Sequence, residues 1–232
     1  MNEAVKRSIC YRWFFYLSGL TILAFGLTLN TKVDLGVSPI LSLSYCVSEL
    51  SEISLANTTF VMYCFFVIMQ LALHCLEKKK SVILLQDILQ LPLSLIFTRV
   101  MDIFVYWIPD FAEDFSGQFA GTTGFRIIIL VVAIICTGIG TAMSINMRIV
   151  ANPADGFVQA LSDFTGKNAG LMKNCVDGFC LMIALCIGLA VAHQPVGVGI
   201  GTILAVFGTG RVVALFNYFC MRKMKRLAAV AE

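Results

Sequence analysis

The chain alternates six long apolar runs with short polar stretches. Each run holds about twenty residues or more, and at about 1.5 Å per residue it crosses a hydrocarbon core of about 30 Å. The runs cover residues 13–31, 57–76, 82–107, 124–147, 170–192 and 196–220. This pattern predicts an all-α membrane protein with six transmembrane helices.

The connections between the runs leave no room for a second domain. The two longest, residues 32–56 and 148–169, are too short to fold into a soluble unit. We therefore expect one membrane domain over residues 1–232. The first run lacks a small-residue cleavage site, which favours a span over a cleaved signal peptide.

Composition and charge fit this class and add an orientation. The chain is 59% hydrophobic and 13% charged. If the N-terminus lies inside, most of the 17 basic residues are cytoplasmic, and only Lys32 and Arg126 fall outside. This bias predicts cytoplasmic N- and C-termini in the cell membrane, with the lipid bilayer as partner. The basic clusters are topology signals, so nucleic-acid binding is not predicted.

The order of elements repeats after 114 residues. Gly26 aligns with Gly140, and Ser38-Pro39 aligns with Asn152-Pro153. Each half contains a span, a short amphipathic helix and two further spans, and an odd number of spans inverts the second copy in the membrane. The halves cover about residues 13–107 and about 124–220. The sequence thus predicts two inverted three-helix repeats, an arrangement in which transporters bind solutes between the halves.

A short amphipathic helix is predicted in each half, over residues 38–50 and 152–164. Ser38 and Asn152 are favourable N-caps, and each precedes a proline that suits the first helical position. Asp155 places a carboxylate in the first turn of the second helix, where the helix dipole favours it. Both helices are too short to span a bilayer.

Two interpretations of these helices remain open. Each helix lies flat at a membrane surface, or each is re-entrant and begins near the midplane. Lys32 and Asp34 in the first linker favour the flat arrangement unless water reaches them. In the re-entrant arrangement, the helix starts at Ser38 and Asn152 would form a positively polarised site suited to an anion or a carboxylate.

Charges inside the spans are candidates for structure or function. Arg99 and Asp102 lie three residues apart, which predicts a structural ion pair. Arg211 has no opposite charge in its own span, so we expect it either to bind an anionic solute or to pair with Asp177 or Asp102. Asp177 is a further candidate for the solute site, with pairing to Lys173 as its alternative.

The remaining polar residues give no pattern of catalysis. Asp87 either extends to the membrane interface or has a function, and His74 and His193, at span ends, are interpreted as interface residues. The nine cysteines lack metal-ligand spacing and are interpreted as reduced apolar residues. No nucleophile–base set or phosphate loop is visible. We expect no catalytic residue, metal or cofactor, and no enzymatic activity.

Two motifs carry a resemblance to a known group. The segment Asp34–Pro39 precedes the serine-rich short helix, and Gly199–Leu204 opens the last span. In this order they resemble the YczE/YyaS/YitT group of bacterial integral membrane proteins. That group often has an aromatic or acidic residue after the proline, whereas Ile40-Leu41 stand here, which leaves Asp155 to supply an acid. The resemblance implies a multi-pass protein of undefined biochemical role.

Three functional hypotheses follow. The first is a transporter or exporter of a small, unidentified solute, with the site between the repeats. Its candidate binding residues are Ser38, Asn152, Asp155, Asp177 and Arg211. The alternative is a non-transporting membrane protein that assists export or assembly of another complex, as a homo-oligomer or with a partner membrane protein. The third, the solute-binding subunit of an energy-coupled importer, is disfavoured because span one lacks an Ala-x-x-x-Ala docking face.

Overall fold

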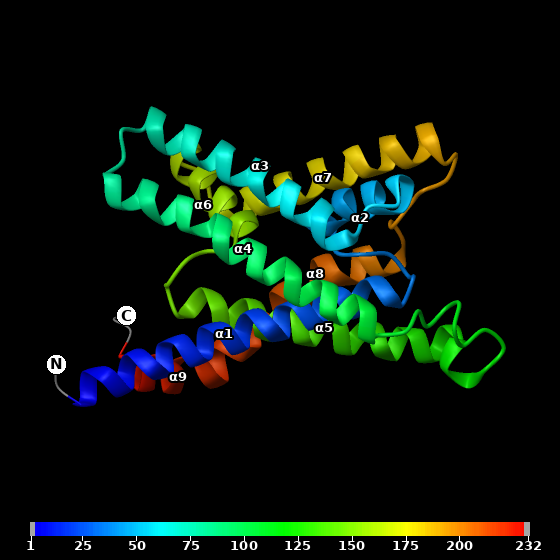
Figure 1. Ribbon diagram of the computed structural model, residues 1–232, viewed down its shortest axis with the longest axis horizontal. Helices are drawn as coiled ribbons and strands as arrows, with labels where there is room; N and C mark the ends of the chain where they lie inside the picture. The colour runs from blue at the N-terminus through cyan, green and yellow to red at the C-terminus, as the bar shows by residue number, and fades with distance from the viewer. Residues whose placement is uncertain (1–2, 230–232) are drawn as a thin grey trace.

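The computed structural model describes residues 3–229 and is built from helices joined by turns and loops (Figure 1). Within that range no strand occurs. Six helices are long and apolar enough to cross a membrane. They are α1 (Glu3–Lys32), α3 (Leu55–Leu76), α4 (Ser81–Trp107), α5 (Thr123–Asn146), α7 (Ala169–Val191) and the helix that begins with α8 (Ile200–Phe216). The six predicted spans are confirmed as helices.

The last span differs most from the prediction. It begins at Ile200 rather than at 196, because Gly197 has a φ of +70° and the chain bends through residues 196–199. Beyond α8 the chain continues through a π-helical segment, η2 (Asn217–Met221), into α9 (Arg222–Ala228). The basic residues of α9 therefore extend the helix past the apolar run, and α9 packs beside the start of α1.

The centre of the molecule is the antiparallel pair α1 and α5, which lie side by side in Figure 1. Glycines allow their backbones to approach closely. A Cβ on Gly26 would meet the backbone of Ala133 at 2.9 Å, and one on Gly140 would meet the backbone of Gly19 at 2.7 Å. Small residues at such crossings permit van der Waals packing between membrane helices.

Two arginines tie the ends of this pair together. Arg12 of α1 donates from Nε and Nη2 to the backbone carbonyls of Met147–Arg148, at 2.7 and 2.6 Å. Arg126 of α5 donates from Nε and Nη2 to the carbonyls of Val33–Asp34, at 2.7 and 2.5 Å. Each guanidinium thus satisfies carbonyls just beyond the C-terminal end of the opposite helix, which helical bonds leave unpaired.

The short helices are α2 (Pro39–Ser51) and α6 (Pro153–Thr165). They begin directly after the predicted caps, Ser38 and Asn152. The Asn152 side chain accepts a hydrogen bond from the N–H of Ala154 at 3.2 Å, whereas the Ser38 side chain makes no capping bond. Each helix ends at a residue in the left-handed conformation.

Both short helices pack against the long ones rather than beyond their ends (Figure 1). α2 contacts α3 and α7, and α6 contacts the same two helices. Polar residues of α2 are buried as well, since Ser42 and Ser44 are 0% and 2% exposed. These serines of α2 therefore pack into protein, whereas a helix lying flat at a membrane surface would turn its polar residues to water.

Candidate functional site

A polar cavity of about 290 Å³ lies between α3, α4 and α6. It is at the end of the bundle that holds the α3–α4 and α5–α6 connections and the first turns of α1 (Figure 1). Its polar lining comes from Gln70, His74, Gln86, Asp87, Gln90 and Gln159. Because α3 and α4 belong to the first half of the sequence and α6 belongs to the second, the cavity joins side chains from both halves.

Asp87 is the central charge of this cavity and is 2% exposed. Gln70 donates from Nε2 to its Oδ1 at 2.5 Å, and His74 Nδ1 lies 2.7 Å from its Oδ2. Gln70 and His74 are four residues apart on α3, so both face the same side of that helix. Both oxygens of the buried carboxylate are therefore paired, as burial of a charge requires.

Two acceptors of the cavity have no partner within the part of the chain that the structure describes. They are the Oε1 atoms of Gln70 and Gln90, whose residues are each 3% exposed. Gly156 of α6 lies opposite them, and a Cβ there would be 2.6 Å from Gln70 Oε1 and 2.9 Å from Gln90 Nε2. The glycine keeps this space open. Unpaired buried acceptors cost about 1–3 kcal/mol each and favour a ligand that donates hydrogen bonds.

Charged groups surround the mouth of the cavity. Lys79 Nζ lies 3.4 Å from Glu77 Oε2 and 3.9 Å from Asp163 Oδ2. Gln159 donates to Asp163 at 2.9 Å. The mouth thus carries both signs of charge, and the interior carries Asp87. Among residues 3–229 no group of three or more His, Cys, Asp or Glu side chains is placed to hold a metal.

Three of the predicted site residues lie along the start of α6 and the facing part of α7. Asn152 Nδ2 lies 3.5 Å from the Tyr63 hydroxyl, beside the cavity. Asp155 is half-buried and interacts electrostatically with Lys173 and Asp177. Lys173 Nζ is 3.4 Å from Asp177 Oδ2, so this carboxylate pairs with the lysine one turn before it.

The other candidates lie apart from the cavity. Ser38 is half-buried at the start of α2, and Arg211 is exposed on α8. Both carboxylates considered as partners of Arg211 contact other cations. Asp177 pairs with Lys173, and Asp102 lies 2.8 Å from Arg99 on the same face of α4.

The most polar part of the cavity was not singled out from the sequence. His74 was expected at the membrane interface, but it is 7% exposed and bonded to Asp87. Asp87 was expected either to extend to the membrane interface or to have a function, and the structure shows it buried. A usable signal existed, because Gln70 and His74 share one face of α3 and Asp87 and Gln90 share one face of the next span. Their contact, however, depends on how the two helices pack.

The two resemblance motifs form one structural unit at the opposite end of the molecule. The N–H of Gly201 donates to the carbonyl of Leu35 at 2.6 Å, and the N–H of Val37 donates to that of Gly197 at 2.9 Å. Gly36 has a φ of +102°, a conformation that side chains rarely allow. The turn after α1 is thereby joined by backbone bonds to the turn before α8.

Comparison with known proteins places the chain in a family through nearly its whole length. Residues 10–218 match the family of unknown function DUF6198. The chain belongs to this family. This DUF6198 member is also similar to the uncharacterized membrane protein YczE of Bacillus subtilis (strain 168), at 23% identity over 235 residues. The alignment covers 97% of this chain and 98% of the relative, and it confirms the predicted resemblance.

The DUF6198 chain is therefore a multi-pass membrane protein, since its relative is a membrane protein and six of its helices are long and apolar enough to span. No solved structure matches it.

Proposed function

We propose that this protein transports a small polar solute, which binds in the cavity between α3, α4 and α6. The observation that supports this most is the pair of buried, unpaired amide oxygens of Gln70 and Gln90 beside the carboxylate of Asp87. Such a lining suits a neutral or cationic molecule with N–H or O–H donors, rather than the anion suggested by the sequence. The volume of about 290 Å³ limits the solute to a small molecule.

We propose further that the two halves are inverted repeats. Arg12 and Arg126, which are 114 positions apart, bind carbonyl pairs that are also 114 positions apart. Left-handed backbone occurs at corresponding positions as well, at Asp34 and Arg148 with φ of 47° and 48°. Inverted repeats are common in secondary transporters, where solutes bind between the halves.

The short helices are proposed to be re-entrant. α6 begins beside Tyr63, within α3, and its Asp163 reaches Lys79, just beyond the end of α3. It therefore runs along roughly the last 20 Å of that span. In the other half, Cys46 of α2 donates from Sγ to the carbonyl of Ala184 within α7 at 3.4 Å, so α2 also lies against a span.

The proposed transport cycle requires access to the cavity from both sides of the membrane in turn. In this conformation the cavity opens at the end that holds the first turns of α1, which the positive-inside bias assigns to the cytoplasm of the cell. At the other end, backbone hydrogen bonds join Leu35 to Gly201 and Val37 to Gly197. We propose that access from the outside requires this contact to open.

A ligand screen tests the proposal. The purified full chain in detergent is heated with individual amines, amino acids, sugars, amides and carboxylates, and the melting temperature is recorded. A ligand at 100 times its Kd stabilises by about 2.7 kcal/mol. We expect a donor-bearing compound to raise the melting temperature, and Gln70→Leu to abolish the rise. Gln118→Leu, at an exposed glutamine outside the cavity, should retain it.

The compounds that bind are then tested for counterflow in liposomes that contain the protein. Saturable exchange that Gln70→Leu abolishes supports transport. If Gln70→Leu responds like the unmodified chain, the cavity is not the binding site. If the compounds bind but are not exchanged, transport is rejected and the alternative, an accessory membrane protein with a ligand site, takes its place.

A further inference from the structure

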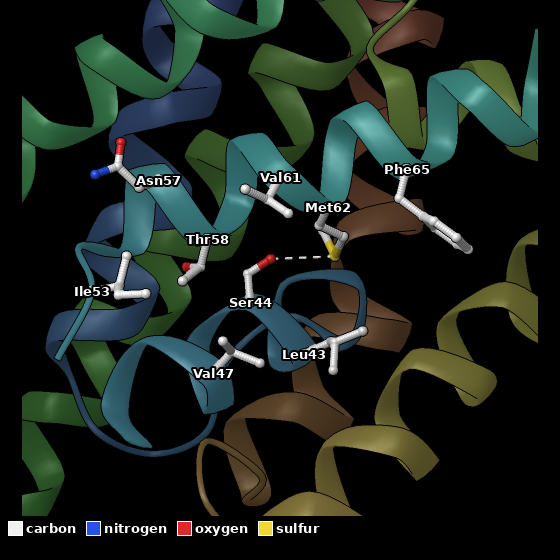
Figure 2. A pocket seen from close by; sticks show the side chains of 9 residues that line it. All are labelled: Leu43, Ser44, Val47, Ile53, Asn57, Thr58, Val61, Met62 and Phe65. Carbon is white, nitrogen blue, oxygen red and sulfur yellow. Dashed lines mark hydrogen bonds between the residues drawn. The ribbon is translucent and has the colours of Figure 1, made fainter. Parts of the chain in front are cut away.

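A second hollow lies on the opposite side of α3 from the polar cavity. It is an apolar groove of about 430 Å³ between α2 and α3 (Figure 2). Leu43 and Val47 of α2 form one wall, and Val61 and Phe65 of α3 form the other. Val61 and Phe65 are 67% and 57% exposed, so the groove is open along the outer surface of a membrane-spanning helix.

The polar groups inside the groove are already paired. Ser44 donates to the sulfur of Met62 at 3.2 Å across the floor, as the dashed line in Figure 2 shows. Thr58 donates to the carbonyl of Leu55 at 3.0 Å. Both hydroxyl donors of the floor are therefore used within the protein, and an apolar chain fits the groove without leaving a buried donor unpaired.

One end of the groove differs from the rest, because the Arg99 side chain lies next to it. Asn57, at the end of the groove in Figure 2, accepts a hydrogen bond of 2.7 Å from Arg99 Nη2. Arg99 Nη1 also donates to Asp102 at 2.8 Å. The Arg99 side chain is 51% exposed, and three of its five N–H donors are left for another acceptor.

We propose that this groove binds a membrane phospholipid, with one acyl chain between α2 and α3 and the phosphate on Arg99. The dimensions agree. From Asn57 to Phe65 the groove follows α3 for about 12 Å, and one leaflet of a hydrocarbon core of about 30 Å is about 15 Å thick. Asn57 is the third residue of α3, so the cationic end lies near the edge of the membrane, where phosphates are.

Arg99 gives the groove its selectivity. Guanidinium groups bind phosphate oxygens through paired N–H donors. An apolar helix of another protein, or a second copy of this chain, would fill the groove but would leave the three remaining N–H donors of Arg99 without an acceptor. A phospholipid satisfies both the apolar wall and the cation, and it is abundant at this position in the membrane.

Lipid binding is measured on the full chain, purified and stripped of lipid in detergent, by titration with phosphatidylethanolamine and native mass spectrometry. Val61→Trp fills the groove, and Ile68→Trp places the same ring on an equally exposed apolar position of α3 outside it, since Ile68 is 63% exposed. Arg99→Gln removes the cation, and Arg99→Lys keeps the charge. We expect Val61→Trp and Arg99→Gln to weaken binding at least tenfold, and Ile68→Trp to weaken it less than threefold. Arg99→Lys loses the paired donors, so its affinity should fall between those of Arg99→Gln and the unmodified chain.

A diacylglycerol with the same chains tests the role of the phosphate and should bind at least tenfold more weakly. Equal binding of the two lipids, or equal binding by Val61→Trp and Ile68→Trp, overturns the assignment. So does a dimer that Val61→Trp dissociates, because a second copy would then occupy the groove. The outcome is independent of transport, since Gln70→Leu changes the other cavity and should leave lipid binding unchanged.

Discussion

Arg12 and Arg126 make equivalent contacts at opposite ends of the α1–α5 pair. Each donates two hydrogen bonds to consecutive carbonyls at the end of the other helix. The contacts differ in their neighbours, since Arg126 also lies 3.3 Å from the Asp34 carboxylate. The central helices are therefore held by two similar clamps, one from each half of the chain.

The two clamps predict two similar losses of stability. Hydrogen bonds to charged groups contribute about 1.5–3 kcal/mol each, so Arg12→Ala and Arg126→Ala should both lower the melting temperature in detergent markedly. Arg7→Ala, on an exposed position of α1, is the control and should leave it unchanged. If only one of the two variants is destabilised, the equivalence of the clamps is wrong.

The sequence predicted the elements because their causes are local. Apolar length defines the spans, and a cap followed by proline defines the start of α6 at Asn152. The clamp at Arg12 and the bond between His74 and Asp87 depend instead on which helices pack together, which hydropathy does not encode. For the same reason, the exposed position of Arg211 could not be foreseen from its place within an apolar run.

The contact between residues 35–37 and residues 197–201 should tolerate no side chain at Gly36. Its φ is +102°, and an added Cβ would lie 2.7 Å from Thr202 Oγ1 and closer still to the backbone of Gly199. We expect Gly36→Ala to reduce the yield of folded protein sharply. Gly210→Ala in α8 is the matched control, because a Cβ there meets nothing within 4 Å. Size-exclusion profiles of the two variants compare their yields of folded protein. Equal profiles would show that the contact at Gly36 is not under steric constraint.

The pairing of Asp87 with His74 predicts an unusual order of stabilities. Removing His74 leaves the buried Oδ2 of Asp87 without its hydrogen bond, which costs about 1–3 kcal/mol, and more for a charged group. His74→Ala should therefore melt at a lower temperature than the double variant His74→Ala with Asp87→Asn, which removes the charge as well. His193→Ala, at an exposed position, controls for loss of a histidine. A double variant less stable than the single one would contradict this account.

Gly156→Ala should separate folding from ligand binding. The atoms nearest to the added methyl would be the ends of two glutamine side chains, at 2.6 Å for Gln70 Oε1 and 2.9 Å for Gln90 Nε2. These ends can move, so we expect a change in melting temperature of a few degrees at most. The displaced amides would no longer face the cavity, and the stabilisation by a bound solute should disappear. Gly178→Ala, where a Cβ meets nothing within 4 Å, should keep the response to solute.

The depth of α6 in the membrane predicts a gradient of thiol reactivity. The nine native cysteines are replaced, and single cysteines are placed at Asp163, Gln159 and Asn152. Asp163 lies near the end of α3, and Asn152 lies beside Tyr63, deeper in the membrane. A charged thiol reagent should therefore label Asp163→Cys fastest and Asn152→Cys at least tenfold more slowly. In intact cells none of the three should react until the membrane is opened, because we expect this end to face the cytoplasm.

A flat α6 predicts a different result, since all three positions would then lie at one surface and react at similar rates. Labelling of Gln159→Cys from outside intact cells would reverse the proposed orientation. Protection of Asn152→Cys by a solute that also raises the melting temperature would connect the gradient to the cavity, because Asn152 lies beside Gln90 at its inner end. Equal protection of Asp163→Cys and Asn152→Cys would instead place the solute at the mouth, near Lys79, and exclude binding at the buried glutamines.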